Sequence, residues 1–210
     1  MLDMLDQISP GRRLIPILGY LAQHPDPTIA AKAALLVSRR IRNPDWVKRH
    51  VNAKDPRIRA NVVEGLWGAD TSYVRPTYED CLRDDNNRVV GNALVGMHLM
   101  GEHGLERRVI SMAGDCRIPF RWTAAWVMGQ VGKPENIPLL QKLMHDDAPG
   151  VRGAALRGLF AIRRMTTPKP AAQAAEEADS RVLMDVDEPA PQATPHKSLM
   201  LDGNSYRYRV

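Results

Sequence analysis

The six histidines and two cysteines are the side chains best suited to hold a metal or to carry out acid–base or nucleophilic chemistry. Metal-binding pairs on a helix are usually spaced three or four residues apart, and no His-x-x-x-His or Glu-x-x-His pair occurs in this sequence. Neither a Gly-rich phosphate loop nor a Gly-x-Ser-x-Gly elbow is present. Cys81 and Cys116 form no disulfide framework. The sequence therefore predicts a protein that is not an enzyme and that has no metal and no cofactor.

Arginines are the second group that could do chemistry. Arg59, Arg121 and Arg152 each follow an apolar residue at an equivalent position of a 31-residue repeat, with Arg88 and Arg157 nearby. One interpretation is a positive stripe that binds an acidic peptide or a nucleic-acid backbone. The other is that these arginines brace acids of neighbouring repeats, since Asp84, Asp115 and Asp146 are also 31 residues apart. The matching spacing favours bracing, and the binding stripe remains the functional alternative.

Tryptophans are the third group. Trp122 and Trp126 are one helical turn apart, so both belong to one side of a helix. Indole rings could stack on a ligand, but they could equally pack between repeats, which is the more usual role of Trp. We retain Trp122 with Arg59, Arg88, Arg121, Arg152 and Arg157 as the candidate partner-binding residues.

The elements that position these side chains are repeated helices. Starting from Val151 and stepping back by 31 residues gives Phe120, Val89 and Ile58, and a step of 29 gives Ile29. Each of these markers has apolar residues four and eight positions later, which is the spacing of one helical face. A second apolar stripe recurs in each half-period, for example at Leu140 and Leu143. Each unit is thus predicted to be a helix pair whose apolar faces are buried only when units stack.

The turns between helices carry capping signals. Asp26-Pro27 and Asp55-Pro56 open second helices, and Asn43-Pro44 opens a first helix. The side chain of an Asp or Asn N-cap accepts a hydrogen bond from a backbone N–H that has no partner within the helix. Pro suits the first helical position because it has no N–H that would need an acceptor there. We expect Asp84, Asp115 and Asp146 to cap the second helices of three successive units in the same way.

Composition narrows the class of protein. The formal net charge is +5, and residues 165–210 hold five basic and seven acidic residues, so the body is basic and the tail slightly acidic. The first residues contain acids before any base, unlike a secretory signal, and no stretch approaches about 18 consecutive apolar residues. Two unpaired cysteines suit a reducing compartment. These observations predict a cytoplasmic protein without membrane insertion.

The chain divides into four parts in this interpretation. Residues 1–10 are a lead-in, 11–164 the helical repeats, 165–180 a Pro- and Ala-containing linker, and 181–210 an extended tail. Alternating residues around Asp202-Gly203 predict a β-hairpin in the tail. An isolated hairpin is marginally stable, so we expect it to dock through four apolar or aromatic residues. These are Leu199, Leu201, Tyr206 and Tyr208.

The second helices resemble those of the HEAT-repeat family. The resemblance lies in the pairs Ile58-Arg59, Phe120-Arg121 and Val151-Arg152, each followed by small residues, and in the Asp-Pro openings. The short period is similar to bacterial HEAT-like repeats of the phycobilisome-lyase type. The resemblance covers about residues 11–164 and implies an all-α, right-handed α-solenoid of about five helix pairs, followed by a mostly extended tail. It also implies that the second helices line a concave face.

The resemblance implies a non-catalytic scaffold or adaptor that binds another protein along this face. The partner would offer an acidic or extended segment, and the C-terminal tail would cap the last unit or dock on the partner. Nucleic-acid backbone binding by the basic stripe is the alternative. HEAT-like DNA alkylation-repair glycosylases place an Asp near helix-borne Trp, but no carboxylate lies one turn from Trp122 or Trp126. A lyase-like accessory subunit ranks last, because no residue supports it.

Overall fold

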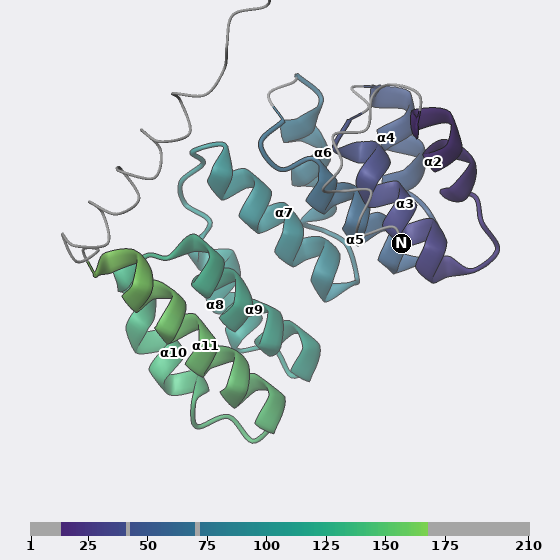
Figure 1. Ribbon diagram of the computed structural model, residues 1–210. Coiled ribbons are helices and arrows are strands. Elements are labelled where there is room, and N and C mark those ends of the chain that lie inside the picture. The colour runs from purple at the N-terminus through teal and green to yellow at the C-terminus, as the bar shows by residue number, and fades with distance from the viewer. Residues whose placement is uncertain (1–13, 41–42, 70–71, 168–210) are drawn as a thin grey trace, which may run out of the picture. The chain divides into compact units, whose positions relative to one another are not determined.

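The computed structural model describes residues 14–40, 43–69 and 72–167, and every regular element in these ranges is helical (Figure 1). The all-α prediction is therefore confirmed for the described residues. The helices, in chain order, are α2 (Ile15–Leu21), α3 (Pro27–Ser38), α4 (Pro44–Val51), α5 (Pro56–Gly65), α6 (Val74–Cys81), α7 (Asn87–Leu99), α8 (Glu106–Ala113), α9 (Ile118–Val131), the 3-10 helix η2 (Pro134–Asn136), α10 (Ile137–Leu143) and α11 (Pro149–Thr166).

Shorter first helices alternate with longer second helices along the chain. Each first helix (α2, α4, α6, α8 and α10) packs on the second helix that follows it. The second helices α3, α5, α7, α9 and α11 also pack against one another in sequence order. This neighbour-to-neighbour packing is the arrangement that the 31-residue repeat predicts.

The core confirms the predicted repeat register. The residues four positions after each marker are fully buried, with an exposed fraction of 0% at Ala33, Val62, Ala93, Ala124 and Ala155. One apolar cluster extends from α7 to α11 and another from α3 to α7, so the clusters cross unit boundaries. Small side chains at these sites let the helices approach closely. A third, smaller cluster of Leu18, Leu36 and Val37 lies within the first helix pair.

The Asp-Pro and Asn-Pro openings act as predicted. The Asp26 carboxylate accepts the N–H of Thr28 at 2.7 Å, and the Asn43 side chain accepts that of Trp46 at 3.0 Å. Asp55 accepts the N–H of Arg57 at 2.8 Å. In each case Pro occupies the first turn, where its missing donor costs nothing.

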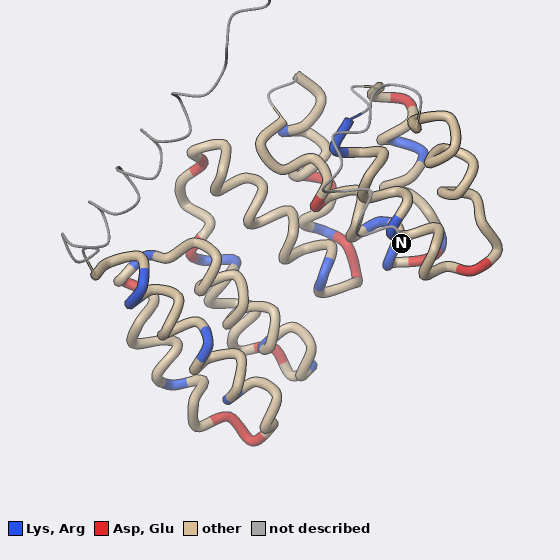
Figure 2. The backbone as a smooth tube through the Cα atoms, in the orientation of Figure 1, with Lys and Arg blue, Asp and Glu red and all other residues tan. Residues whose placement is uncertain are grey.

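The predicted capping role of Asp84, Asp115 and Asp146 is wrong in position. Each carboxylate accepts the N–H of the residue two further on, at 2.8–2.9 Å, and that residue is the N-cap. The three acids therefore shape the loop before the helix instead of its first turn. In each of the three, the second carboxylate oxygen accepts a hydrogen bond from an arginine side chain. Figure 2 shows acidic residues in these loops.

The predicted end of the repeats at residue 164 lies inside α11, which continues to Thr166. Tail residues 168–210 lie outside those described, and so do the expected hairpin and its docking residues Leu199, Leu201, Tyr206 and Tyr208. Among the described residues no helix combines the length and apolar character needed to cross a membrane.

Candidate functional site

Arg59 joins two consecutive units through an ion pair. Its Nε and Nη2 atoms donate to the two carboxylate oxygens of Asp84, at 2.8 and 2.9 Å, and Nη2 also reaches Asp85 at 3.1 Å. Its Nη1 atom donates to two carbonyl oxygens of the preceding loop, Ala53 at 2.9 Å and Lys54 at 3.1 Å. All three nitrogens are engaged, so this guanidinium braces the loops before α5 and α7.

Arg121 repeats the same arrangement two units later. Its Nε and Nη2 atoms donate to Asp146 at 2.7 and 3.0 Å, and Nη2 reaches Asp147 at 2.6 Å. Its Nη1 atom bonds the carbonyl oxygens of Asp115 and Cys116. The paired side chains of Arg121 and Asp146 are only 13% and 7% exposed. Arg59 and Arg121 are thus engaged in bracing, the alternative that the sequence spacing favoured.

These ion pairs lower the pKa of both aspartates. For Asp146 the side-chain hydrogen bonds from Arg121 are the main cause of the lowered pKa, and burial opposes them. For Asp84 burial is the largest single influence and raises the pKa. The hydrogen bonds from Arg59, from the Asn86 N–H and with Asp85, together with the positive charge of Arg59, lower it, and the net pKa shift is downward. Both carboxylates are therefore charged near neutral pH, and each neutralises the arginine beside it.

Of the four remaining candidates, Arg152 donates from Nη1 to the carbonyl oxygens of Asp146 and Asp147, at 2.9 and 3.0 Å, and lines neither hollow described next. The other three, Arg88, Trp122 and Arg157, line two hollows that share Trp122 and Trp126. The first hollow, of about 320 Å³, is lined by Glu64, Arg88, Asn92, Trp122, Thr123 and Trp126. The second, of about 380 Å³, is lined by Trp122, Trp126, Gly129, Gln130, Ala154, Arg157, Gly158 and Ala161. Every one of these residues belongs to a second helix, from α5 to α11. We call this surface the tryptophan groove.

The groove has fixed aromatic walls. Trp126 stacks on Trp67 with ring centroids 6.3 Å apart and an angle of 25° between the planes. The indole N–H of Trp67 donates to the Asn92 carbonyl at 2.9 Å, and the Asn92 amide donates to the Ala60 carbonyl at 2.8 Å. Trp67 and Asn92 are thereby anchored across α5 and α7, and they hold the ring of Trp126 in place.

The groove also has polar groups that are available to a ligand. Within the described part of the chain, the guanidinium groups of Arg88 and Arg157 have no acceptor, and the same holds for the indole nitrogens of Trp122 and Trp126. Arg88 belongs to the first hollow and Arg157 to the second. Four donors beside apolar rings suit a ligand segment with carboxylates and apolar groups.

Two polar or aromatic residues of the groove, Trp126 and Glu64, were not among the candidate binding residues chosen from the sequence. Trp126 shares a helix face with Trp122 and could have been included on its i, i+4 spacing. Glu64 places a carboxylate in the first hollow beside both tryptophans, and Arg39 lies 3.8 Å from it. Glu64 is 58 residues away from Trp122 in sequence, so no local pattern could reveal it.

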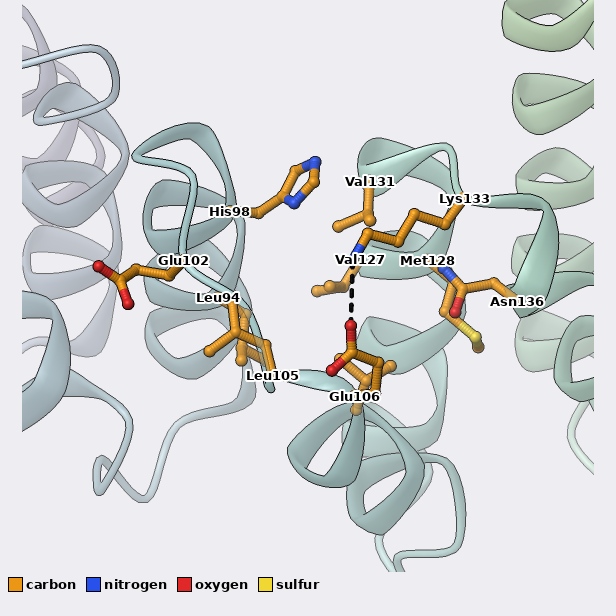
Figure 3. Close-up of a pocket in the computed structure, with 11 residues that line it drawn as sticks. Leu94, His98, Glu102, Leu105, Glu106, Val127, Met128, Val131, Lys133 and Asn136 are labelled. Carbon is orange, nitrogen blue, oxygen red and sulfur yellow. Dashed lines mark hydrogen bonds and ion pairs between the residues drawn. The ribbon is translucent and has the colours of Figure 1, made fainter.

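Two other cavities lack the combination of tryptophan rings and unpaired arginines found in the tryptophan groove. A cavity of about 30 Å³, enough for about one water, lies between α7, α8 and α9. Figure 3 draws the side chains that line it. Lys133 and Glu106 form an ion pair of 3.0 Å beside it, and burial lowers the pKa of His98 in its wall. A hollow of about 430 Å³ between α4 and α6 holds Asp45, Asp80 and Asp84 with Lys48, and it has no tryptophan.

Metal-ligand clusters and thiols are two further kinds of chemical group to consider in the described ranges. No cluster of three or more His, Cys, Asp or Glu side chains is arranged there to hold a metal ion. Cys81 is buried in α6, and burial raises the pKa of its thiol to about 12. Cys116 is exposed in the loop before α9.

Comparison with known proteins supports the resemblance to HEAT repeats. A family model described as HEAT repeats matches residues 105–185. Among solved structures, human deoxyhypusine hydroxylase in complex with glycerol is similar with a TM-score of 0.44 and 12% sequence identity. The similarity covers 73% of this chain and 64% of that chain, so this chain spans less than two thirds of the enzyme's length. No curated protein matches the sequence.

Proposed function

We propose that this protein is a non-catalytic scaffold that binds another protein in the tryptophan groove. HEAT repeats are commonly protein-interaction scaffolds, and the family match covers α8 to α11, the helices that supply Trp122, Trp126 and Arg157. In this proposal the second helices form the concave face of a right-handed solenoid, as in other HEAT arrays. The tryptophan groove is the part of that face that the partner contacts.

One observation carries the proposal. Trp122 and Trp126 are shared by two hollows, and each hollow contains an arginine without an acceptor among the described residues, Arg88 in one and Arg157 in the other. Trp and Arg are the residues most enriched at the energetic centres of protein interfaces. Here they lie together and are supported by Trp67 and Asn92, so the surface needs little rearrangement to bind.

The chemistry of the groove indicates the kind of segment that binds. An aliphatic or aromatic side chain fits beside the rings, and carboxylates pair with Arg88 and Arg157. A partner segment that combines Asp or Glu with an apolar residue meets both requirements. Arg59 and Arg121 attract the carboxylates of such a partner only weakly, because Asp84 and Asp146 already neutralise their charges.

Nucleic-acid binding is the second candidate, since bases can stack on the tryptophans and phosphates can pair with the same two arginines. The pairing of Arg59 and Arg121 with aspartates argues against nucleic-acid binding. Binding to a phosphate backbone requires several positive charges that are not already neutralised by acids of the protein. Protein binding therefore ranks first.

A binding comparison with defined probes tests the proposal. The full chain is screened against an array of fluorescent peptides that pair Asp or Glu with Leu, Phe or Trp, and against the same peptides with Lys in place of the acids. Labelled single-stranded and duplex DNA are titrated in parallel at two salt concentrations. We expect acidic peptides to bind, and the matched Lys peptides and both DNAs to bind at least 10-fold more weakly.

Two variants locate the binding. Trp122→Ala and Arg157→Glu are each expected to weaken the best peptide at least 10-fold, which corresponds to about 1.4 kcal/mol. Lys142→Glu, an exposed charge reversal on the first helix α10, is the control and should leave affinity unchanged. Tight DNA binding with a steep loss of affinity at higher salt would replace the proposal with the nucleic-acid alternative, and peptide binding that survives both groove variants would refute the assigned site.

A further inference from the structure

One side of the last second helix, α11, is exposed where the same side of earlier second helices is buried. Leu156 is 43% exposed, whereas the residues 31, 62 and 93 positions before it are at most 1% exposed. Those residues are Ala125, Leu94 and Val63. Phe160, which occupies the register of the buried Gly129, is 57% exposed. We call the surface formed by Leu156 and Phe160 the open side of α11.

The open side is the side on which a following second helix packs. In α9 the position of Phe160 is taken by Gly129, and a Cβ atom there would lie 2.9 Å from the Cα atom of Gly158 in α11. The second helices from α3 to α11 pack on one another in sequence order, and α11 is the last helix of the described residues. Leu156 and Phe160 therefore lie where a further helix would make contact.

Arg152, one helical turn before Leu156, carries an unused pair of donors. Its Nη1 atom bonds the carbonyl oxygens six and five residues before it, at 2.9 and 3.0 Å. Arg59 and Arg121 use Nη1 in the same way. The guanidinium of Arg152 is therefore held in the pose of the other two. Its Nε and Nη2 atoms have no acceptor among the described residues, whereas the same atoms of Arg59 and Arg121 bond a carboxylate.

The two occupied arginines show what such a donor pair receives. Arg59 in α5 binds Asp84, which lies in the loop before α7, and α7 packs on α5. Arg121 in α9 binds Asp146, which lies in the loop before α11, and α11 packs on α9. In both cases an aspartate and the helix that follows it dock together, the carboxylate on the arginine and the helix along the arginine's own helix. Arg152 and the open side of α11 present the same two features.

Charge determines which kind of molecule the open side attracts. The helix α11 contains four arginines and no acidic residue. All four are exposed, namely Arg152, Arg157, Arg163 and Arg164. Two copies of the chain that met through α11 would bring these like charges together, so self-association through this side is disfavoured. A partner with a carboxylate complements both the charge of the helix and the free donors of Arg152.

The size of Phe160 adds a requirement on shape. The equivalent Gly129 lets the next helix approach to backbone contact, whereas the Phe160 ring projects from α11. A helix that lies along the open side therefore needs Gly or Ala opposite this ring, and apolar residues beside it to cover Leu156.

We propose that the open side of α11 and Arg152 form a docking surface for a helix of another protein, one that follows an aspartate and carries Gly or Ala on its contact face. The aspartate accepts from Nε and Nη2 of Arg152, and the helix covers Leu156 and Phe160. None of these three residues lines the tryptophan groove, so this surface is separate from the function proposed above.

A binding experiment with two helical peptides tests the carboxylate contact. Both peptides are fluorescent and held helical by a side-chain staple, and both carry Gly and Ala on one face with Leu beside it. The first begins with Asp-Asp and the second with Asn-Asn. We expect the Asp peptide to bind the full chain about 10-fold more tightly, because a bidentate bond to a charged group is lost with Asn.

A double-mutant cycle assigns that contact to Arg152. Arg152→Gln should weaken the Asp peptide about 10-fold and leave the Asn peptide almost unchanged, since the partner group is already missing from it. Arg107→Gln, an exposed arginine on the first helix α8, is the matched control and should change neither affinity. Equal losses of both peptides in Arg152→Gln, or no loss of either, would overturn the proposal.

The apolar contact has its own matched pair of variants. Phe160→Ala should weaken both peptides about 10-fold or more. Ile110→Ala in α8, where the side chain is also 57% exposed, should leave both affinities unchanged. Without peptide, neither variant should lower Tm. A lower Tm in Phe160→Ala alone would mean that the chain itself covers the open side, and this would overturn the proposal.

Two further measurements exclude the other occupants. Loss of Asp-peptide binding in Trp122→Ala but not in Arg152→Gln would place the peptide in the tryptophan groove, which would refute the α11 surface and leave the proposed function standing. Sedimentation of the chain alone at two concentrations should give one mass. A mass that rises with concentration in the wild type but not in Phe160→Ala would assign the open side to a second copy instead.

Discussion

Gly129 in α9 faces Gly158 in α11 so closely that a Cβ atom on Gly129 would lie 2.9 Å from the Cα atom of Gly158. A Cβ on Gly158 would lie 3.1 Å from the Ala125 carbonyl oxygen. These neighbours are backbone atoms, which cannot rotate away as a side chain can. The two glycines therefore set the close approach of α9 and α11, and with it the width of the tryptophan groove, because Gly129 and Gly158 both line it.

Replacing Gly129 by alanine should destabilise the protein by about 1–3 kcal/mol, because the added methyl group forces the two backbones apart. Urea unfolding followed by circular dichroism measures this change. Gly19→Ala is the matched control. Nothing lies within 4 Å of a Cβ at Gly19 in α2, and alanine favours helix by up to about 1 kcal/mol, so this variant should be neutral or slightly stabilised. Equal losses in both variants would contradict the proposed close contact.

Asp84→Asn should lower Tm by about 2–4 °C, the shift for about 1 kcal/mol in a chain of this size. The amide loses the charge opposite Arg59 and can accept only one of its two hydrogen bonds. Asp85 provides the comparison, since it contacts the same guanidinium but its side chain is 91% exposed. Asp85→Asn should therefore change Tm very little. A larger effect at Asp85 than at Asp84 would refute the structural role assigned to the bidentate pair.

The free energy of unfolding of the wild-type protein should fall in acid more steeply than that of variants without the Arg59–Asp84 and Arg121–Asp146 ion pairs. The pKa values of Asp84 and Asp146 are lowered in the folded state, so their contribution is fully present above the unfolded value of about 3.9. That contribution is lost as the pH falls below about 4 toward the folded pKa values. The free energy of unfolding, measured by urea titration from pH 7 to pH 3, should show this slope. In the double variant Asp84→Asn, Asp146→Asn the slope in this window should be shallower.

The two cysteines should react at very different rates. Cys116 is exposed, whereas Cys81 is buried and its thiol pKa is raised to about 12, so little thiolate is present at pH 8. Maleimide labelling of the native protein, read by mass spectrometry, should modify Cys116 first and Cys81 only after urea is added. The variant Cys116→Ser should be almost unlabelled under native conditions. Rapid native labelling of that variant would contradict the burial of Cys81.

Much of the fold was predictable from local pattern. The apolar register predicted the helices and the buried positions, since a helical face repeated at a fixed period requires stacking to bury it. The caps at Asp26, Asn43 and Asp55 followed from residue type alone.

The sequence by itself determined the repeat, its register and the set of charged residues that recur with it. Only the tertiary structure decided which arginines are neutralised and which are available. Arg59 and Arg121 meet aspartates in the next unit, whereas Arg88 and Arg157 meet none among the described residues. The physical reason is that these contacts cross from one unit to the next. They depend on how the helices are placed and rotated against each other, and the helical period within a single unit does not specify that.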